Sequence, residues 1–81
     1  MFIHTYTENA KPWEKQATEW HVAVFLSTKE NRIEIMNWCY DTFGPPVNPK
    51  TGQTRWKNGI TWGEAIFKQK KDLEWFVLRW S

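Results

Sequence analysis

The sequence predicts a small α+β domain in which a short antiparallel sheet packs against two helices. Three observations lead to this fold class. A run rich in β-branched and aromatic residues predicts a strand at Trp20–Leu26, an apolar repeat predicts a helix over residues 28–43, and an Asn-Gly pair predicts a hairpin turn at Asn58–Gly59. The chain of 81 residues has room for one core, so we expect a single domain over residues 1–81.

The residues before the first expected strand are less informative. Phe2–Thr7 alternates weakly between apolar and polar residues, as an edge strand does, and residues 8–17 contain Pro12 and indicate a connection. Whether residues 2–7 join the sheet stays open. The strand Trp20–Leu26 is short and hydrophobic, which is typical of a strand buried on at least one face.

Residues 28–43 carry a start signal, a helical period and a stop signal. Ser27 and Glu30 fit a capping box, in which each side chain accepts a hydrogen bond from the other residue's backbone N–H. Gly44 suits the left-handed position after the last turn, and the prolines that follow it prevent continuation. The apolar stripe expected to face the sheet is Ile33, Met36, Tyr40 and Phe43, with Cys39 beside it.

The second half of the chain predicts a loop, a hairpin and a second helix. Residues 44–54 contain three prolines and two glycines and indicate a surface loop. Asn58–Gly59 predicts a type I′ turn, because both central residues of that turn need positive φ. Residues 70–80 fit a returning strand or a helix. We expect a helix, with Asp72 as its N-cap, because the apolar residues follow helical spacing: Leu73, Phe76, Val77 and Trp80.

The expected order, β-α-β-β-α with both helices on one face, resembles a ferredoxin-like split unit that lacks its last strand unless the N-terminal stretch replaces it. Two fragments carry a second resemblance, NWCYDTFG (Asn37–Gly44) and AIFKQKKDLEWFVLRW (Ala65–Trp80). They are similar to small uncharacterised proteins encoded by tailed bacteriophages, which match this chain in size and tryptophan content. That resemblance implies a viral accessory role and no particular mechanism.

No motif of an enzyme is present, and we expect no catalytic residues, no cofactor and no metal. Cys39 falls in the C-terminal half of its helix, where the dipole disfavours a thiolate, and we expect it to be a buried core residue. His4 and His21 lack the spacing of zinc ligands, and Glu30 and Glu34 belong to the solvated helix face. The single cysteine and the absence of a signal peptide or membrane span favour a soluble protein of a reducing cytoplasm.

The mixture of aromatic and basic residues around the hairpin is the strongest functional pattern. Seven Trp and five Phe are a heavy aromatic load for 81 residues, and the net charge is only +2. The rings belong to the core, to a protein-binding surface or to a surface that stacks on single-stranded nucleic acid. The candidate binding residues are Arg55, Trp56, Lys57, Trp62 and Lys68.

Three functions follow from this pattern taken together with the viral role that the phage resemblance implies, and we rank them. The first is a phage-encoded accessory protein without catalytic activity that binds a host or viral protein. Trp56 and Arg55 are expected to project from the hairpin and to contact that partner. The second is a small module that binds single-stranded nucleic acid through the basic hairpin. The third is a structural component of a virion, which self-association would support. The partner's identity and the oligomeric state stay open.

Overall fold

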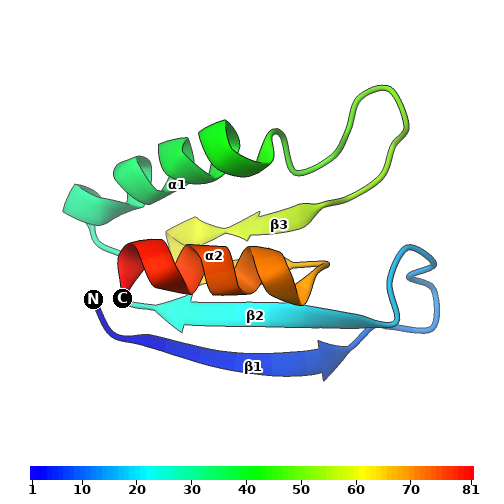
Figure 1. Ribbon diagram of the computed structural model, residues 1–81, viewed down its shortest axis with the longest axis horizontal. Coiled ribbons are helices and arrows are strands. Elements are labelled where there is room, and N and C mark those ends of the chain that lie inside the picture. Colours follow the sequence, from blue (N-terminus) through cyan, green and yellow to red (C-terminus); the bar gives the residue numbers. More distant parts are fainter.

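The computed structural model describes residues 1–81 and contains four strands and two helices in the order β-β-α-β-β-α (Figure 1). The sheet is antiparallel with strand order β1-β2-β4-β3. The α+β class is therefore confirmed, and the N-terminal stretch does join the sheet. The elements are β1 (Ile3–Asn9), β2 (Glu19–Phe25), α1 (Lys29–Phe43), β3 (Trp56–Gly59), the 3₁₀ turn η1 (Ile60–Trp62), β4 (Glu64–Phe67) and α2 (Lys70–Trp80).

One hydrophobic core lies between the sheet and the helices. Side chains alternate between the two faces of a strand, so Ala23 and Phe25 of β2 point to the same face as Ala65 and Phe67 of β4. Both helices cover this face, because the buried residues of α1 and α2 belong to the same cluster as these strand residues. The helical members are Ile35, Cys39 and Phe43 of α1 with Leu73 and Phe76 of α2.

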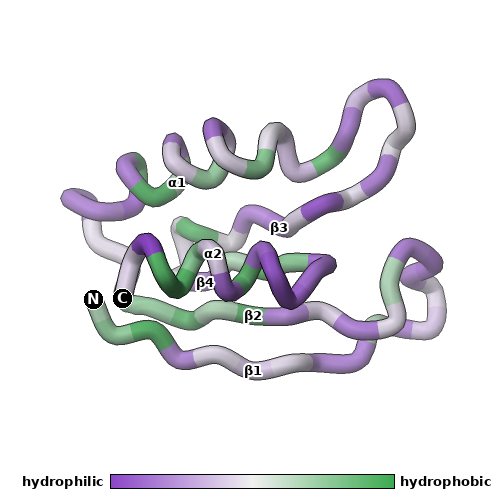
Figure 2. The backbone as a smooth tube through the Cα atoms, viewed as in Figure 1, coloured by the Kyte–Doolittle hydropathy of each residue, from purple (hydrophilic) through white to green (hydrophobic).

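Hydropathy separates the inner strand from the edge strand. Figure 2 shows β2 as hydrophobic along its second half, whereas β1 is mostly pale or hydrophilic between its ends. In β1 every residue from His4 to Asn9 is exposed, and only Ile3 packs against the core. The helices therefore cover β2, β4 and β3 and leave β1 uncovered on both faces.

The N-terminal end of α1 differs from the expectation by one residue. The N-cap is Thr28, whose Oγ1 accepts from Asn31 N at 3.2 Å while Thr28 N donates to Asn31 Oδ1 at 2.8 Å. The expected capping box of Ser27 and Glu30 is therefore wrong. The Asn31 amide also donates to Leu26 O at 3.0 Å, and this bond ties the helix start to the end of β2.

The apolar stripe of α1 is also rotated from the expected one. Ile35, Cys39 and Phe43 are buried, whereas Ile33 is 64% exposed and Tyr40 lies half-exposed at the rim. The prediction that Ile33 and Tyr40 face the sheet is wrong, and Phe43 alone of the expected stripe is fully buried. Several spacings of apolar residues are compatible with one helix, and the position of the sheet selects among them.

The hairpin is present, but its turn is not at Asn58–Gly59. Both residues belong to β3, and Gly59 has φ −111°, so the type I′ turn is wrong. The chain reverses through η1 and then Gly63, which has φ 83°. Asn58 contributes through its side chain instead, because its Oδ1 accepts from Ile60 N at 3.1 Å and starts the turn.

The second helix is confirmed over Lys70–Trp80, with a different cap from the expected one. Its N-cap is Gln69, which makes no side-chain capping bond. Asp72 lies inside the first turn and is buried, so its role as the N-cap is wrong. A carboxylate in the first turn still interacts favourably with the helix dipole.

Candidate functional site

The five residues assigned from the sequence do not form one surface. Trp56 is fully buried, donates from Nε1 to Gly44 O at 3.0 Å and meets the Tyr40 ring edge-on at 5.4 Å between centroids. The prediction that Trp56 projects from the hairpin is wrong. This ring closes the core beneath the end of α1, where it satisfies a carbonyl that the helix leaves unpaired.

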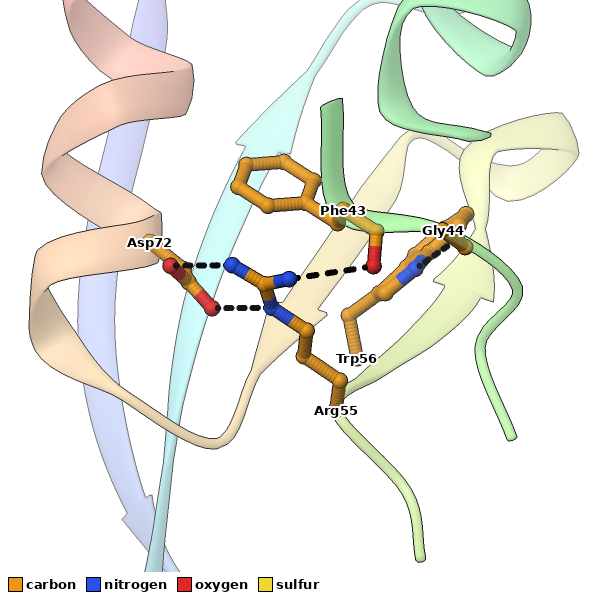
Figure 3. A network of polar contacts seen from close by, with 5 residues as sticks. All are labelled: Phe43, Gly44, Arg55, Trp56 and Asp72. Carbon is orange, nitrogen blue, oxygen red and sulfur yellow. Dashed lines mark hydrogen bonds and ion pairs between the residues drawn. The ribbon is translucent and has the colours of Figure 1, made fainter. Parts of the chain in front are cut away.

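Arg55 joins three segments of the chain (Figure 3). Its Nε and Nη2 donate to the two carboxylate oxygens of Asp72 at 3.1 and 3.4 Å, and its Nη1 donates to Phe43 O at 3.2 Å. The guanidinium also lies over the Phe43 ring, 5.3 Å from its centroid. All three sets of contacts are internal, so Arg55 holds the ends of α1 and α2 against the start of β3 and carries little free charge.

Lys57 lies on the face of the sheet that the helices leave open. Its Nζ is 2.7 Å from Glu14 Oε2 and 4.2 Å from the centroid of the Trp20 ring. The hydrogen bond from Lys57 lowers the pKa of Glu14, and a second bond from the Lys11 backbone acts in the same direction. The Trp20 ring is thus covered by this ion pair and is not available for stacking on a base.

The remaining two residues are far from each other along the sheet. Trp62 is 84% exposed and lies in η1, beside the end where β2 gives way to α1. Lys68 follows β4 and, with Lys71, lines a polar hollow of about 320 Å³ next to Arg55. No aromatic residue lines this hollow, so it offers cations without a ring to stack on.

Cys39 and His21, two titratable side chains of the types that serve in catalysis or metal binding, are both buried. Cys39 is fully buried, and burial raises the pKa of its thiol to about 12, which keeps it protonated. His21 is buried beside Thr7 and Glu19, with Nδ1 3.4 Å from the Thr7 hydroxyl. No three His, Cys, Asp or Glu side chains gather in a set able to hold a metal ion.

A different surface gathers exposed apolar side chains, and it lies between the two helices. A groove of about 500 Å³ is lined by Trp38 and Thr42 of α1 and by residues of α2. On α2, Trp75 is 55% exposed and Leu78 is 72% exposed. Their three-residue spacing puts both side chains on one side of the helix. Arg79 lies at the rim of the same groove.

Contacts between aromatic rings support one wall of this groove. The Trp38 ring meets Phe43, Phe76 and Trp80 edge-on, with centroids 5.5, 6.2 and 6.0 Å away. Edge-to-face contacts of this kind are worth about 0.5–1.5 kcal/mol each and favour this orientation of the ring in the unbound protein. Arg79 stacks 4.1 Å from the Trp80 ring and belongs to none of the three ion pairs of the protein, so its charge is available to a ligand.

Sequence reasoning missed this groove, although one signal for it was present. Trp75 and Leu78 fall outside the stripe through which α2 packs on the sheet, so that helix has apolar residues on a second side. An exposed Trp and Leu on the outer side of a helix are typical of a binding surface.

Comparisons of the chain with family models, with curated proteins and with solved structures find no match. Neither helix combines the length and the hydrophobicity that crossing a lipid bilayer requires.

Proposed function

We propose that this protein is a non-catalytic binding module whose groove between α1 and α2 receives an amphipathic helix of a partner protein. The observation that carries the proposal is the exposure of Trp75 and Leu78 beside the Trp38 ring. Trp and Arg are enriched among the residues that dominate binding energy at protein interfaces, and both line this groove.

A helical partner fits the shape and the chemistry of the groove. An antiparallel pair of helices presents a channel between them, and an amphipathic helix fills such a channel with apolar residues spaced by three and four. The free guanidinium of Arg79 at the rim would pair with a carboxylate on that helix. The partner is therefore expected to carry an apolar stripe flanked by Asp or Glu.

The charges of the protein favour this function over nucleic-acid binding. Arg55 is neutralised by Asp72 and Lys57 by Glu14, so two of the three basic residues assigned to a nucleic-acid surface are already paired. Binding to phosphates draws its free energy from free cations that release counterions. The rings over which these two cations lie, Phe43 and Trp20, are both buried.

The resemblance of Asn37–Gly44 and Ala65–Trp80 to small tailed-phage proteins supports an accessory role, in which the partner is a host or viral protein of the host cytoplasm. The strand order also supports the finer assignment of the fold as a ferredoxin-like split unit. β4 lies between β2 and β3, and β1 takes the outer position beside β2. Domains of that kind serve many unrelated functions, so the fold itself assigns none.

Site-specific crosslinking tests this function. A photoreactive amino acid in place of Leu78 is expected to capture a discrete protein from host or infected lysate treated with nuclease, whereas one in place of Lys50 in the 44–54 loop is not. The captured protein, once purified, should bind Trp75→Ala about thirtyfold or more weakly than the wild type, because truncating a central Trp costs about 2 kcal/mol or more.

Two exposed tryptophans outside the groove provide matched controls, Trp13 and Trp62. Trp13→Ala and Trp62→Ala should bind the same partner as well as the wild type. A partner that binds Trp75→Ala undiminished refutes the groove, and one that requires Trp62 instead points to the hairpin. Loss of all capture on nuclease treatment would favour the nucleic-acid function.

A further inference from the structure

The two edges of the sheet are treated differently. The β3 edge is four residues long, and the preceding loop lies along its start, where Arg55 N donates to Pro46 O at 2.9 Å and Val47 bridges Thr54. The β1 edge is seven residues long and pairs with β2 in unbroken register from Ile3↔Phe25 to Asn9↔Glu19. Figure 1 shows no segment on its outer side.

The hydrogen-bond pattern identifies which backbone groups of β1 are free. Just beyond the strand, Ala10 N donates to Thr18 O at 2.9 Å, and positions that bond to one neighbour alternate along an antiparallel strand. His4, Tyr6 and Glu8 therefore bond to β2. The N–H and C=O groups that point outward belong to Ile3, Thr5, Thr7 and Asn9.

Edge strands of monomeric proteins usually carry features that prevent pairing with another chain. These are prolines, charged side chains (lysine above all), bulges or a covering segment. β1 has the sequence IHTYTEN, without proline or lysine, and its register has no bulge; its one acidic side chain is Glu8. Ile, Thr and Tyr favour extended structure, and every residue from His4 to Asn9 is exposed. The edge is therefore ready to receive another strand.

We propose that β1 pairs antiparallel with β1 of a second copy of this chain, which joins the two sheets into one of eight strands. With the twofold axis at Tyr6, Thr5 lies opposite Thr7 of the second copy and Ile3 lies opposite Asn9. All four outward residues then form hydrogen-bonded pairs, and the two Tyr6 residues face each other at a non-hydrogen-bonded position. Moving the axis to Thr5 or Thr7 leaves one outward residue unpaired.

The side chains favour the same register. On the face away from the helices, His4 lies opposite Glu8 of the second copy, so a donor or cation meets a carboxylate in two symmetric places. The two Tyr6 rings, each half-exposed in one chain, come together at the axis. The strand is thus complementary to itself, which an isologous interface requires.

Sedimentation analysis over a concentration series measures the association, and Thr5→Pro tests the edge. Because the Thr5 N–H points outward, proline there removes hydrogen bonds only from the pairing between copies. The dissociation constant is expected to rise about tenfold or more, because the axis doubles each lost bond. Thr5→Lys, which keeps the backbone N–H and adds charge to the edge, provides a second variant should the proline disturb folding. Circular dichroism checks that both variants fold.

Cysteine crosslinking tests the register. Under mild oxidation Tyr6→Cys should give a disulfide-linked dimer, because facing residues at a non-hydrogen-bonded position lie about 4.5 Å apart between Cα atoms. His4→Cys alone should not, because the two copies of residue 4 lie about 13 Å apart along the strands. A mixture of His4→Cys and Glu8→Cys should crosslink again. The native Cys39 is buried and does not compete.

Any one of four outcomes overturns the proposal. The first three are that the wild type sediments as a monomer at every concentration, that the dimer persists unchanged in both Thr5 variants, and that His4→Cys alone crosslinks as well as Tyr6→Cys. An extended peptide of another protein that occupies the edge while this chain stays monomeric also overturns it. None of these results depends on the groove between the helices, so this proposal and the proposed function fail separately.

Discussion

Gly63 provides a sharp test of how the β3–β4 hairpin is built. Its φ of 83° places it in the left-handed region, and its carbonyl accepts from Phe25 N at 2.9 Å. A Cβ atom at this position would overlap the carbonyl oxygen of Phe25 and lie 3.6 Å from its carbonyl carbon. Both atoms are backbone, so no side-chain rotation relieves the overlap. We therefore expect Gly63→Ala to displace β2 from β4.

The expected loss has three sources. A left-handed non-glycine residue costs about 1–2 kcal/mol, overpacking that shifts backbone costs about 1–3 kcal/mol, and weakening the hydrogen bond to Phe25 costs about 0.5–1.5 kcal/mol. Together they give about 3–6 kcal/mol. The whole domain is expected to have roughly 4–12 kcal/mol of stability at its length, so Gly63→Ala should leave it marginally folded or unfolded.

Chemical denaturation of three alanine variants measures this effect. Gly52 has a similar φ of 72°, but a Cβ there meets nothing within 4 Å, so Gly52→Ala should lose only the conformational cost of about 1–2 kcal/mol. A Cβ atom at Gly59 would lie 3.2 Å from Glu64 Cβ, a milder contact than at Gly63, and the φ of Gly59 is one that alanine adopts without strain. Equal losses for Gly63→Ala and Gly52→Ala would refute the close approach to Phe25. A larger loss at Gly59 would return the turn to Asn58–Gly59.

Three further predictions concern ionisable groups. The folded protein keeps the Cys39 proton to about pH 12, whereas the unfolded chain loses it near the ordinary pKa of 9.0. The contribution of the Cys39 thiol to the free energy of unfolding is thus intact below pH 9 and falls by about 1.4 kcal/mol per pH unit above it. If the free energy of unfolding of the wild type and of Cys39→Ala changed with pH in parallel, this expectation would be contradicted. Arg55→Met leaves the buried Asp72 carboxylate unpaired and should lower the free energy of unfolding by about 1–3 kcal/mol. This loss is smaller than for a fully buried ion pair because Arg55 is half-exposed. A double-mutant cycle with Asp72→Asn should give a coupling energy of about 0.5–3 kcal/mol, whereas additive losses would show that the two side chains do not interact. In a carbon-13 NMR titration the Glu14 carboxyl should show a pKa below its ordinary value, and Lys57→Met should raise that pKa. If the Glu14 pKa is the same in the wild type and in Lys57→Met, the ion pair does not persist in solution.

The elements of the fold that could be predicted are those with a local cause. The helix over residues 28–43 could be predicted because a helical apolar period ends at Gly44, although its N-cap is Thr28 and its buried side is rotated from the expected stripe. The helical spacing of apolar residues likewise predicts α2, although its N-cap is Gln69 and not Asp72. The turn was not, because Asn58–Gly59 has the strongest local preference for a hairpin while the close approach of Gly63 to Phe25 depends on a strand far away in the sequence. Tertiary contact outweighed the local preference there.

Which tryptophans lie on the surface could not be predicted, for a similar reason. Composition indicated that this chain has more large rings than its core needs, and the structure does leave Trp13, Trp62 and Trp75 exposed while it buries Trp20 and Trp56. Which ring belongs to which group depends on the face of the sheet and the rotation of the helices. A cation beside a ring in the sequence, as at Arg55–Trp56, marked an internal contact to α1 and α2 rather than a binding surface.

Pairing through the β1 edge would leave the groove between the helices accessible in both copies, so one dimer would present two grooves. Residues that face each other in an antiparallel pair point to the same face, so pairing through β1 places the helix layers of both copies on one side of the joined sheet. Two grooves would then face the same direction, and a surface that displays several copies of the partner helix would bind both. The second binding event becomes intramolecular, which raises the apparent affinity by about 10²-fold or more without a new contact.

Dissociation from a densely coated sensor should therefore be much slower for the wild type than for Thr5→Pro, while on a sparsely coated sensor the two should dissociate at the same rate. Equal rates at both densities would show that the two copies do not present their grooves together.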